Sequence, residues 1–211
     1  LLDSTHQYWN MQHQFDQHGI SFKDAKMDVP KMVGRKDAIV KQFTGGIAML
    51  FKANKVTAYY GFGQLQPGNV VKVKQHDGSE VELKGTNVII AAGSDSIELP
   101  FAKFDGESIV DNVGALDFLE VPKRLAVIGA GVIGLELGSV WKRLGAEVTI
   151  LEGLPTFLGA VDEQVAKEAH KAFTKQGLKI ELGVKVGDIK NGKKGVSVAY
   201  TNAKGEAQTL D

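Results

Sequence analysis

Hydrophobic residues recur at helical spacing in two stretches near the start of the chain. Residues 3–18 place Tyr8, Trp9, Met11 and Phe15 on a predicted helix that ends at Gly19. A second helix is predicted after Pro30, to about Asn54, with one apolar face that we expect to pack on a sheet and with Gly45-Gly46 allowing close packing. The apolar positions of this second helix are Met32, Ile39, Val40, Phe43, Ile47, Leu50 and Phe51.

From Val56 the hydrophobic period shortens to that of strands. Residues 56–60, 70–74 and 81–83 are predicted to form a strand meander. The apolar run 87–94 is too short for a helix and ends near glycine, which predicts a buried parallel strand. Residues 100–122 are expected to connect two domains. The turns that separate the meander strands are predicted at 61–63, 67–69 and 77–78.

A strand, a glycine-rich turn and a helix follow one another after residue 124. The apolar run 125–128 suits a strand buried on both faces, and Gly129, Gly131 and Gly134 then open a helix. The first glycine permits a tight turn, the second leaves room for a pyrophosphate, and the third lets helix and strand pack closely. The helix N-terminus offers N–H groups and a positive dipole end to phosphates. This order predicts a dinucleotide site.

A carboxylate closes the next strand, 146–152, about 20 residues after the turn, at the spacing typical of a ribose-binding acid. At this position Glu152 would accept hydrogen bonds from ribose hydroxyls and repel a 2′-phosphate, which favours NAD over NADP. The alternative is a solvated carboxylate that merely ends a strand. Further along, the sequence predicts a helix over 162–176 ended by Gly177, a strand over 178–182, and strands over 184–210 that turn at 191–192 and 204–205.

Composition narrows the classes of function. The chain has 211 residues, 43% of them hydrophobic, which suits one large or two modest domains. Its 25 basic and 25 acidic side chains cancel without a basic stripe, and no apolar run approaches the roughly 18 residues of a membrane helix, so we expect neither nucleic acid nor membrane as partner. A soluble intracellular protein is the default expectation. The absence of cysteine excludes thiol nucleophiles, disulfides and thiolate metal sites within this chain.

Two long stretches, 110–122 and 127–145, carry a family resemblance, together with residues 1–4, 60–63, 91–94 and 182–186. They resemble the flavoprotein pyridine nucleotide-disulfide oxidoreductases, in particular the branch that oxidises dihydrolipoamide. The resemblance implies an α/β fold with a Rossmann-like NAD domain over 119–211, which would lack its last strand. It also implies a partial FAD domain with the meander and the connection over 1–118. Because the chain begins at Leu1 without an initiator methionine or signal peptide, we expect it to be a central fragment of a longer protein.

The same resemblance implies cofactor contacts at individual positions. The flavin would be contacted at Gly61, Ala92, Gly93 and Ser94, with alanine replacing the family's usual threonine at Ala92. NAD would be contacted at Gly129, Ala130, Gly131, Val132, Ile133, Gly134, Leu135, Glu136, Glu152 and Val186. In relatives the carboxylate corresponding to Glu136 reaches the junction of nicotinamide and flavin. The alternative for Glu136 is a stabilising position in the first turn of its helix.

The activity implied by the resemblance is transfer of electrons from protein-bound dihydrolipoamide through a disulfide and FAD to NAD. The parent would be a homodimer that serves a 2-oxo acid dehydrogenase complex through lipoyl domains, in a bacterial cytoplasm or a mitochondrial matrix. The family's cysteine pair, flavin fingerprint and catalytic histidine lie outside the matched region, so we expect this chain alone to be inactive and to self-associate. Its histidines 6, 13, 18, 76 and 170 suit surface or packing roles, with no metal site. The alternatives are a sibling such as mercuric reductase, or an NAD-binding module without catalysis.

Overall fold

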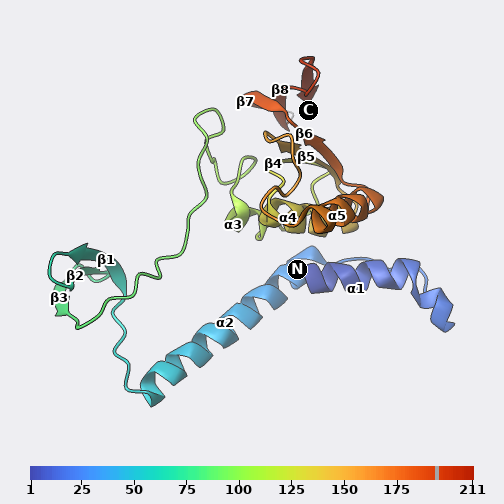
Figure 1. Cartoon of the computed structure of the whole chain (residues 1–211). Coiled ribbons are helices and arrows are strands. Elements are labelled where there is room, and N and C mark those ends of the chain that lie inside the picture. Colours follow the sequence, from blue (N-terminus) through green and yellow to red (C-terminus); the bar gives the residue numbers. More distant parts are fainter. Residues whose placement is uncertain (193–194) are drawn as a thin grey trace. The chain divides into compact units, whose positions relative to one another are not determined.

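The computed structural model describes residues 1–192 and 195–211 and divides into two compact units, each of which is described by itself (Figure 1). The first unit contains Leu1–Asp37 and Ser96–Asp211, and the second contains Ala38–Asp95. The predicted division into cofactor domains, 1–118 and 119–211, has other boundaries than these compact units and stays a prediction.

A parallel sheet forms the centre of the first unit. Its strands β4 (Arg124–Ile128), β5 (Glu147–Glu152) and β6 (Lys179–Leu182) lie in the order β4-β5-β6. Helix α4 (Val132–Arg143) connects β4 to β5, and α5 (Glu163–Lys175) connects β5 to β6. These strands and helices confirm the predicted strand, helix, strand, helix and strand. Asp162 caps α5 because its carboxylate accepts hydrogen bonds from the Gln164 and Val165 amides.

The core of this unit lies between the sheet and α4. Trp141, Val140 and Leu135 project from α4 and are almost fully buried against Val148 and Ile150 of β5. The Trp141 ring also contacts Phe118, with 5.3 Å between ring centroids. The apolar face of α4 therefore fixes the helix on the sheet, which sets the position of its N-terminus.

A second, antiparallel sheet follows β6. Strands β7 (Lys185–Gly192), β8 (Gly195–Thr201) and β9 (Ala207–Leu210) lie in sequence order and carry their own small core around Tyr200 and Val198. The predicted turn at 204–205 is confirmed. The turn predicted at 191–192 is wrong at these positions, because both residues belong to the end of β7 and pair with β8; residues 193–194, which follow them, lie outside the described residues.

The first predicted helix is confirmed with a break. Helix α1 (Leu2–His13) is followed by a short 3-10 helix, η1 (Phe15–His18), and Gly19 ends the segment with a left-handed φ of 72°. Helix α1 packs on α4 and buries Thr5 there. A short helix, α3 (Asn112–Ala115), lies in the segment that was predicted as a connection.

The second predicted helix is also confirmed, as α2 (Val29–Ala53), but its predicted packing is wrong. Only Val29, Met32 and Val33, in its first turns, are buried. Beyond them the side chain of Phe43 is 69% exposed, and apart from the backbone of α2 itself no described atom outside the adjacent residues lies within 4 Å of a Cβ built at Gly45 or Gly46. Among the described residues, no sheet covers the apolar face of α2 beyond Val33.

The second unit contains the predicted meander, with one strand displaced. Strands β1 (Gly61–Gln66), β2 (Val70–Gln75) and β3 (Glu80–Lys84) form an antiparallel sheet. The strand predicted at 56–60 and the turn predicted at 61–63 are wrong. The hairpin after Gln66 sets the register, so that Gly61 pairs with Gln75 at the end of β2 and residues 56–60 have no partner on β2.

The strand predicted at 87–94 is likewise wrong. Residues 88–95 form neither helix nor strand, and the side chains of Ile89 and Ile90 are 91% and 75% exposed. A buried parallel strand requires neighbouring strands to satisfy its backbone, and none of the described residues pairs with this segment. Among the described residues, no helix has both the length and the apolar character needed to cross a membrane.

Candidate dinucleotide-binding site

The glycine-rich turn lies between β4 and α4, at the carboxyl end of the parallel sheet. Gly129 has a φ of +103°, a conformation that residues with a side chain rarely adopt. Its amide donates a hydrogen bond to the Leu151 carbonyl oxygen at 2.8 Å, which ties the turn to β5. The chain can therefore reverse abruptly from the strand into the helix.

The other two glycines differ in what surrounds them. A Cβ on Gly134 would lie 2.4 Å from the Gly129 carbonyl oxygen and 3.1 Å from Cγ1 of Val127, so only glycine fits where the helix meets the strand. A Cβ on Gly131 would meet no atom within 4 Å. The space beside Gly131 is therefore open, which suits the close approach of a pyrophosphate to the backbone.

Helix α4 begins beside this open space. Gly131 is the N-cap residue, with no side chain that could cap the helix, and its carbonyl accepts a hydrogen bond from the Leu135 amide at 3.0 Å. The amides of Val132, Ile133 and Gly134 belong to the first turn and have no intrahelical acceptor. Together with the helix dipole, these N–H groups suit an anionic ligand.

Glu152 lies at the end of β5, next to the turn. One carboxylate oxygen accepts a hydrogen bond from the Ala130 amide and the other from the Leu154 amide, each at 2.8 Å. Glu152 therefore stabilises the turn through these two hydrogen bonds. Its remaining lone pairs can still accept hydrogen bonds from a ligand. It is half-buried and bonded, rather than a merely solvated carboxylate at a strand end. The Ala130 amide is consequently occupied, and Ala130 is 2% exposed.

Sequence reasoning identified Glu152 but missed these two bonds. The parallel register pairs Ile128 with Leu151, so the residue after Leu151 lies opposite the beginning of the turn. If the apolar runs 125–128 and 148–151 are aligned in parallel so that they end at the same level, Glu152 falls beside the turn. This alignment would have indicated that its carboxylate reaches the turn amides.

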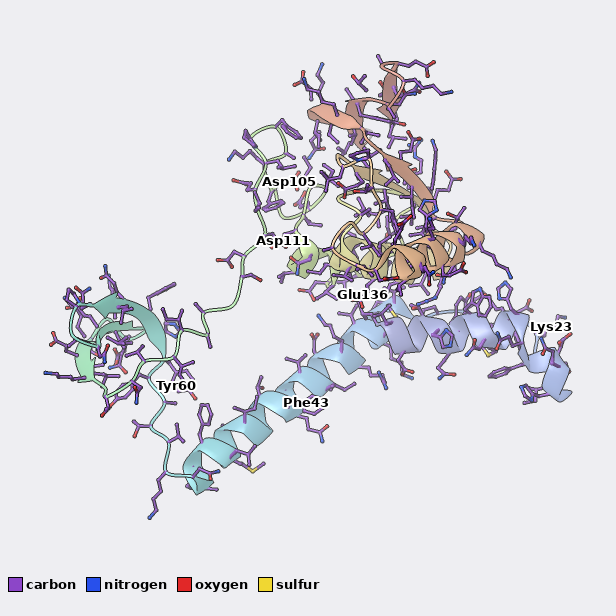
Figure 2. All side chains as sticks on the ribbon, in the orientation of Figure 1. Lys23, Phe43, Tyr60, Asp105, Asp111 and Glu136 are labelled. Atoms are coloured by element: carbon purple, nitrogen blue, oxygen red, sulfur yellow. The ribbon has the colours of Figure 1, made fainter. Side chains whose placement is uncertain are left out.

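Glu136 and Val186 were expected at the same site. Glu136 is exposed on α4, as Figure 2 shows, and it is the fifth residue of the helix. The alternative that placed it in the first helical turn is wrong, because that turn contains no acidic residue. Val186 is half-buried on β7, where it pairs with Tyr200 of β8. Both remain predicted NAD contacts.

The expected flavin contacts lie in the second unit. A Cβ on Gly61 would lie 2.1 Å from the Lys74 carbonyl oxygen, so the close approach of β1 to β2 explains this glycine without a cofactor. Residues 92–94 are exposed and outside any strand. The described residues thus fit NAD at the glycine turn, but they do not by themselves form a groove for FAD.

Residues 5–211 match the pyridine nucleotide-disulphide oxidoreductase family, and the match covers almost the whole chain. The chain belongs to this family. Its mixed α/β architecture is that of a partial FAD/NAD fold, as the resemblance implied.

Similar proteins agree with this assignment. The chain is 52% identical to dihydrolipoyl dehydrogenase of Cupriavidus necator, in an alignment that covers 100% of this chain and 44% of the relative. It is 45% identical to mitochondrial dihydrolipoyl dehydrogenase of Caenorhabditis elegans, covering 100% and 43% respectively. The chain therefore spans less than half the length of the curated relatives it matches.

A solved structure supports the fold. The crystal structure of LpdA from Mycobacterium tuberculosis superimposes with a TM-score of 0.84 at 23% identity. The superposition covers 99% of this chain and 45% of that one. At this identity the likeness concerns the fold alone.

Proposed function

We propose that this chain forms the NAD-binding part, together with a portion of the flavin-binding part, of a dihydrolipoyl dehydrogenase. The observation that carries the proposal is the hydrogen bond from the Ala130 amide to Glu152, since it holds an open glycine turn, a helix N-terminus and a ribose-binding carboxylate together. The high identity to two dihydrolipoyl dehydrogenases supports the choice of enzyme within the family.

In the proposed site, the residues around the turn bind different parts of NAD. The amides at the start of α4, from Val132 to Gly134, bind the pyrophosphate beside Gly131. Glu152 accepts hydrogen bonds from the adenosine ribose hydroxyls while it keeps its bonds to the turn. Val186 packs beside the adenine, and Glu136 lies toward the nicotinamide end. NAD, when bound, supplies the hydride acceptor, and these residues bind and orient it.

The reaction of the whole enzyme is proposed to be oxidation of protein-bound dihydrolipoamide, with NAD as the final acceptor. The enzyme would be a homodimer that docks on a 2-oxo acid dehydrogenase complex through lipoyl domains, in a bacterial cytoplasm or a mitochondrial matrix. We derive no flavin step from this chain, because residues 92–94 do not form a flavin groove among the described residues.

Two alternatives compete with this proposal. The first alternative is another reductase of the same family. A member that uses NADP would carry cations rather than Glu152 at the ribose, whereas mercuric reductase differs in the substrate on which its thiols act. A non-catalytic NAD-binding module would need no cysteine, in keeping with the composition of this chain. The complete reading frame separates the last alternative, because a reductase requires a cysteine pair and a catalytic histidine in the same polypeptide.

Isothermal titration calorimetry with NAD⁺ and NADP⁺ tests the NAD site directly. We expect the purified chain to bind NAD⁺ at least about tenfold more tightly than NADP⁺, which corresponds to about 1.4 kcal/mol. Preference for NADP⁺ would exclude the proposed branch of the family. Failure of the folded chain to bind either nucleotide would overturn the proposed site.

A further inference from the structure

A cavity of about 290 Å³ lies away from the glycine turn, where α1 meets the C-terminal ends of α4 and α5. All of its residues belong to the first compact unit, and α1 contacts α4 directly (Figure 1). Its lining residues Lys142 and Arg143 lie at the far end of α4 from the turn, and the 12 residues of this helix span about 18 Å at 1.5 Å per residue. The residues that line this α1–α4 cavity are His6, Trp9, His13, Lys142, Arg143 and Gln176.

One wall of the cavity is a row of stacked rings on α1. The Trp9 ring lies nearly parallel to the His13 ring, with 4.6 Å between centroids, and to the His6 ring, with 6.4 Å. The Trp9 carbonyl oxygen lies 2.9 Å from Nδ1 of His13. Because a carbonyl can only accept, Nδ1 carries the proton, and Nε2 of His13 remains for another partner. This wall is aromatic, with polar ring edges.

The facing wall is cationic. Arg143 is half-buried, and its guanidinium donates to Oγ1 of Thr5 at 3.4 Å. Burial lowers the pKa of Arg143, and no charged neighbour contributes to that shift. Throughout residues 1–192 and 195–211, no carboxylate forms an ion pair with Arg143 or Lys142. Two adjacent cations thus border a cavity whose lining contains no acid.

The end of α4 does not use these cations as caps. Backbone amides already satisfy two of its last carbonyls, since Leu144 and Ala146 donate to the Trp141 carbonyl and Gly145 donates to the Lys142 carbonyl. The helix dipole still favours cations here, but it stabilises a charge without requiring a hydrogen-bond partner. Most of the five guanidinium N–H donors of Arg143 therefore remain for a ligand.

We propose that the α1–α4 cavity binds a small phosphate-bearing molecule, with its phosphate on Lys142 and Arg143. Arginine presents a planar fork that matches phosphate oxygens, and lysine adds a point charge. The ring edges of Trp9 and His13 would contact the remainder of the molecule. The volume of about 290 Å³ lies just below the usual range for ligand pockets, roughly 300–1,000 Å³, which suits a compact phosphate ester rather than a dinucleotide. This proposal does not depend on NAD binding at the turn.

Nuclear magnetic resonance of the 211-residue chain can test the cavity and the turn separately. We would titrate the chain with pyrophosphate and with ribose 5-phosphate, using ribose as the uncharged control. The signals to follow are the His6 and His13 ring protons and the Trp9 indole N–H for the cavity, and the Gly131 amide for the turn. We expect saturable shifts of the ring signals with both anions and none with ribose.

Matched charge variants identify the groups responsible. The double variant Lys142→Gln/Arg143→Gln should weaken the ring-signal titration at least tenfold and leave the Gly131 titration unchanged. The control, Lys167→Gln/Lys171→Gln, removes two cations of α5 that pair with Glu163 and Glu168, and it should titrate as the wild type does. If the double variant unfolds, Lys142→Gln alone tests the same cation and should weaken binding by a smaller factor.

Two outcomes would overturn the proposal. One is a ring-signal titration that does not saturate, or that responds equally in the charge variant and its control. The other is a shift confined to Gly131, since that would place the anion at the turn only. Tighter binding of ribose 5-phosphate than of pyrophosphate would support a phosphorylated metabolite, whereas the reverse order would support a free inorganic anion with the same phosphate chemistry.

Discussion

The Glu152 carboxylate accepts a hydrogen bond from the Ala130 amide at 2.8 Å, although 22 residues separate them along the chain. The parallel pairing of β4 with β5 brings them together. Glu152, which is expected to bind the ribose, therefore also holds the turn that would bind the pyrophosphate. Substitutions at Glu152 should affect both the shape of the turn and the choice of nucleotide.

Glu152→Gln tests this double role. The glutamine amide has one acceptor oxygen in place of two, so either the Ala130 or the Leu154 amide loses its partner. We expect NAD⁺ affinity, measured by calorimetry, to fall at least about tenfold and the preference over NADP⁺ to shrink. Glu147→Gln, on the exposed first residue of the same strand, is the control and should bind as the wild type does. Unchanged NAD⁺ affinity in Glu152→Gln would contradict the assigned role.

Alanine at two glycines should separate folding from binding. Gly134→Ala places a methyl group 2.4 Å from the Gly129 carbonyl oxygen, so the turn must shift. Such overpacking typically costs about 1–3 kcal/mol, which should appear as a lower free energy of unfolding in urea. Gly131→Ala meets no atom within 4 Å and should keep the wild-type stability, yet its methyl group would enter the proposed pyrophosphate space and weaken NAD⁺ binding.

Two results would contradict the roles assigned to Gly131 and Gly134. If Gly131→Ala binds NAD⁺ normally, the open space beside Gly131 is not the pyrophosphate position. If Gly134→Ala is as stable as the wild type, the close contact between α4 and β4 is not required for the fold.

The stability of the first unit should depend on pH through Asp105, which is labelled in Figure 2. Hydrogen bonds from the Ile109 and Glu107 amides, joined by that of Ser108 and the Asn191 side chain, lower the pKa of Asp105 from 3.8 to about 2. Because the folded pKa is depressed, the stabilisation is complete well above pH 3.8 and disappears as the pH falls through about 2. Asp105→Asn should therefore be less stable than the wild type near neutral pH.

Urea titrations at several pH values measure this difference. The gap in unfolding free energy between the wild type and Asp105→Asn should narrow progressively between about pH 4 and about pH 2. A gap that is the same throughout would show that the carboxylate charge does not stabilise the connection to β7.

The chain by itself should not oxidise dihydrolipoamide. Dithiol oxidation through an enzyme disulfide requires a thiolate, and the 211 residues contain no cysteine. We expect no NADH production when the purified chain is supplied with FAD, dihydrolipoamide and NAD⁺. Turnover by a cleanly purified chain, above that of a heat-denatured sample, would contradict this expectation.

The sequence predicted local structure well where neighbours in the chain are also neighbours in space. The elements around Gly129 and Glu152 were correct because strand, turn and helix satisfy one another within about 30 residues, as in a βαβ unit. The strand at 87–94 was wrong because its apolar pattern describes a partnered strand, and Ile89 finds no partner among the described residues. The same reason explains the exposed Phe43 face of α2.

The cationic side of the α1–α4 cavity could not be predicted from spacing. Arg143 and Thr5 are separated by 138 positions in the sequence, and only the packing of α1 on α4 brings them together. In contrast, the spacing of His6, Trp9 and His13 at positions i, i+3 and i+7 of a predicted helix was visible, but it gave no indication of a facing cation.

The most direct test of the central claim is a nuclear magnetic resonance titration of the backbone amides with NAD⁺. The account predicts saturable shifts for the amides of Gly131 to Leu135 and for Glu152 and Val186, with little change in the β1–β2–β3 sheet. The absence of shifts at millimolar NAD⁺, or shifts that avoid the glycine turn, would contradict the assignment of this turn as the NAD site.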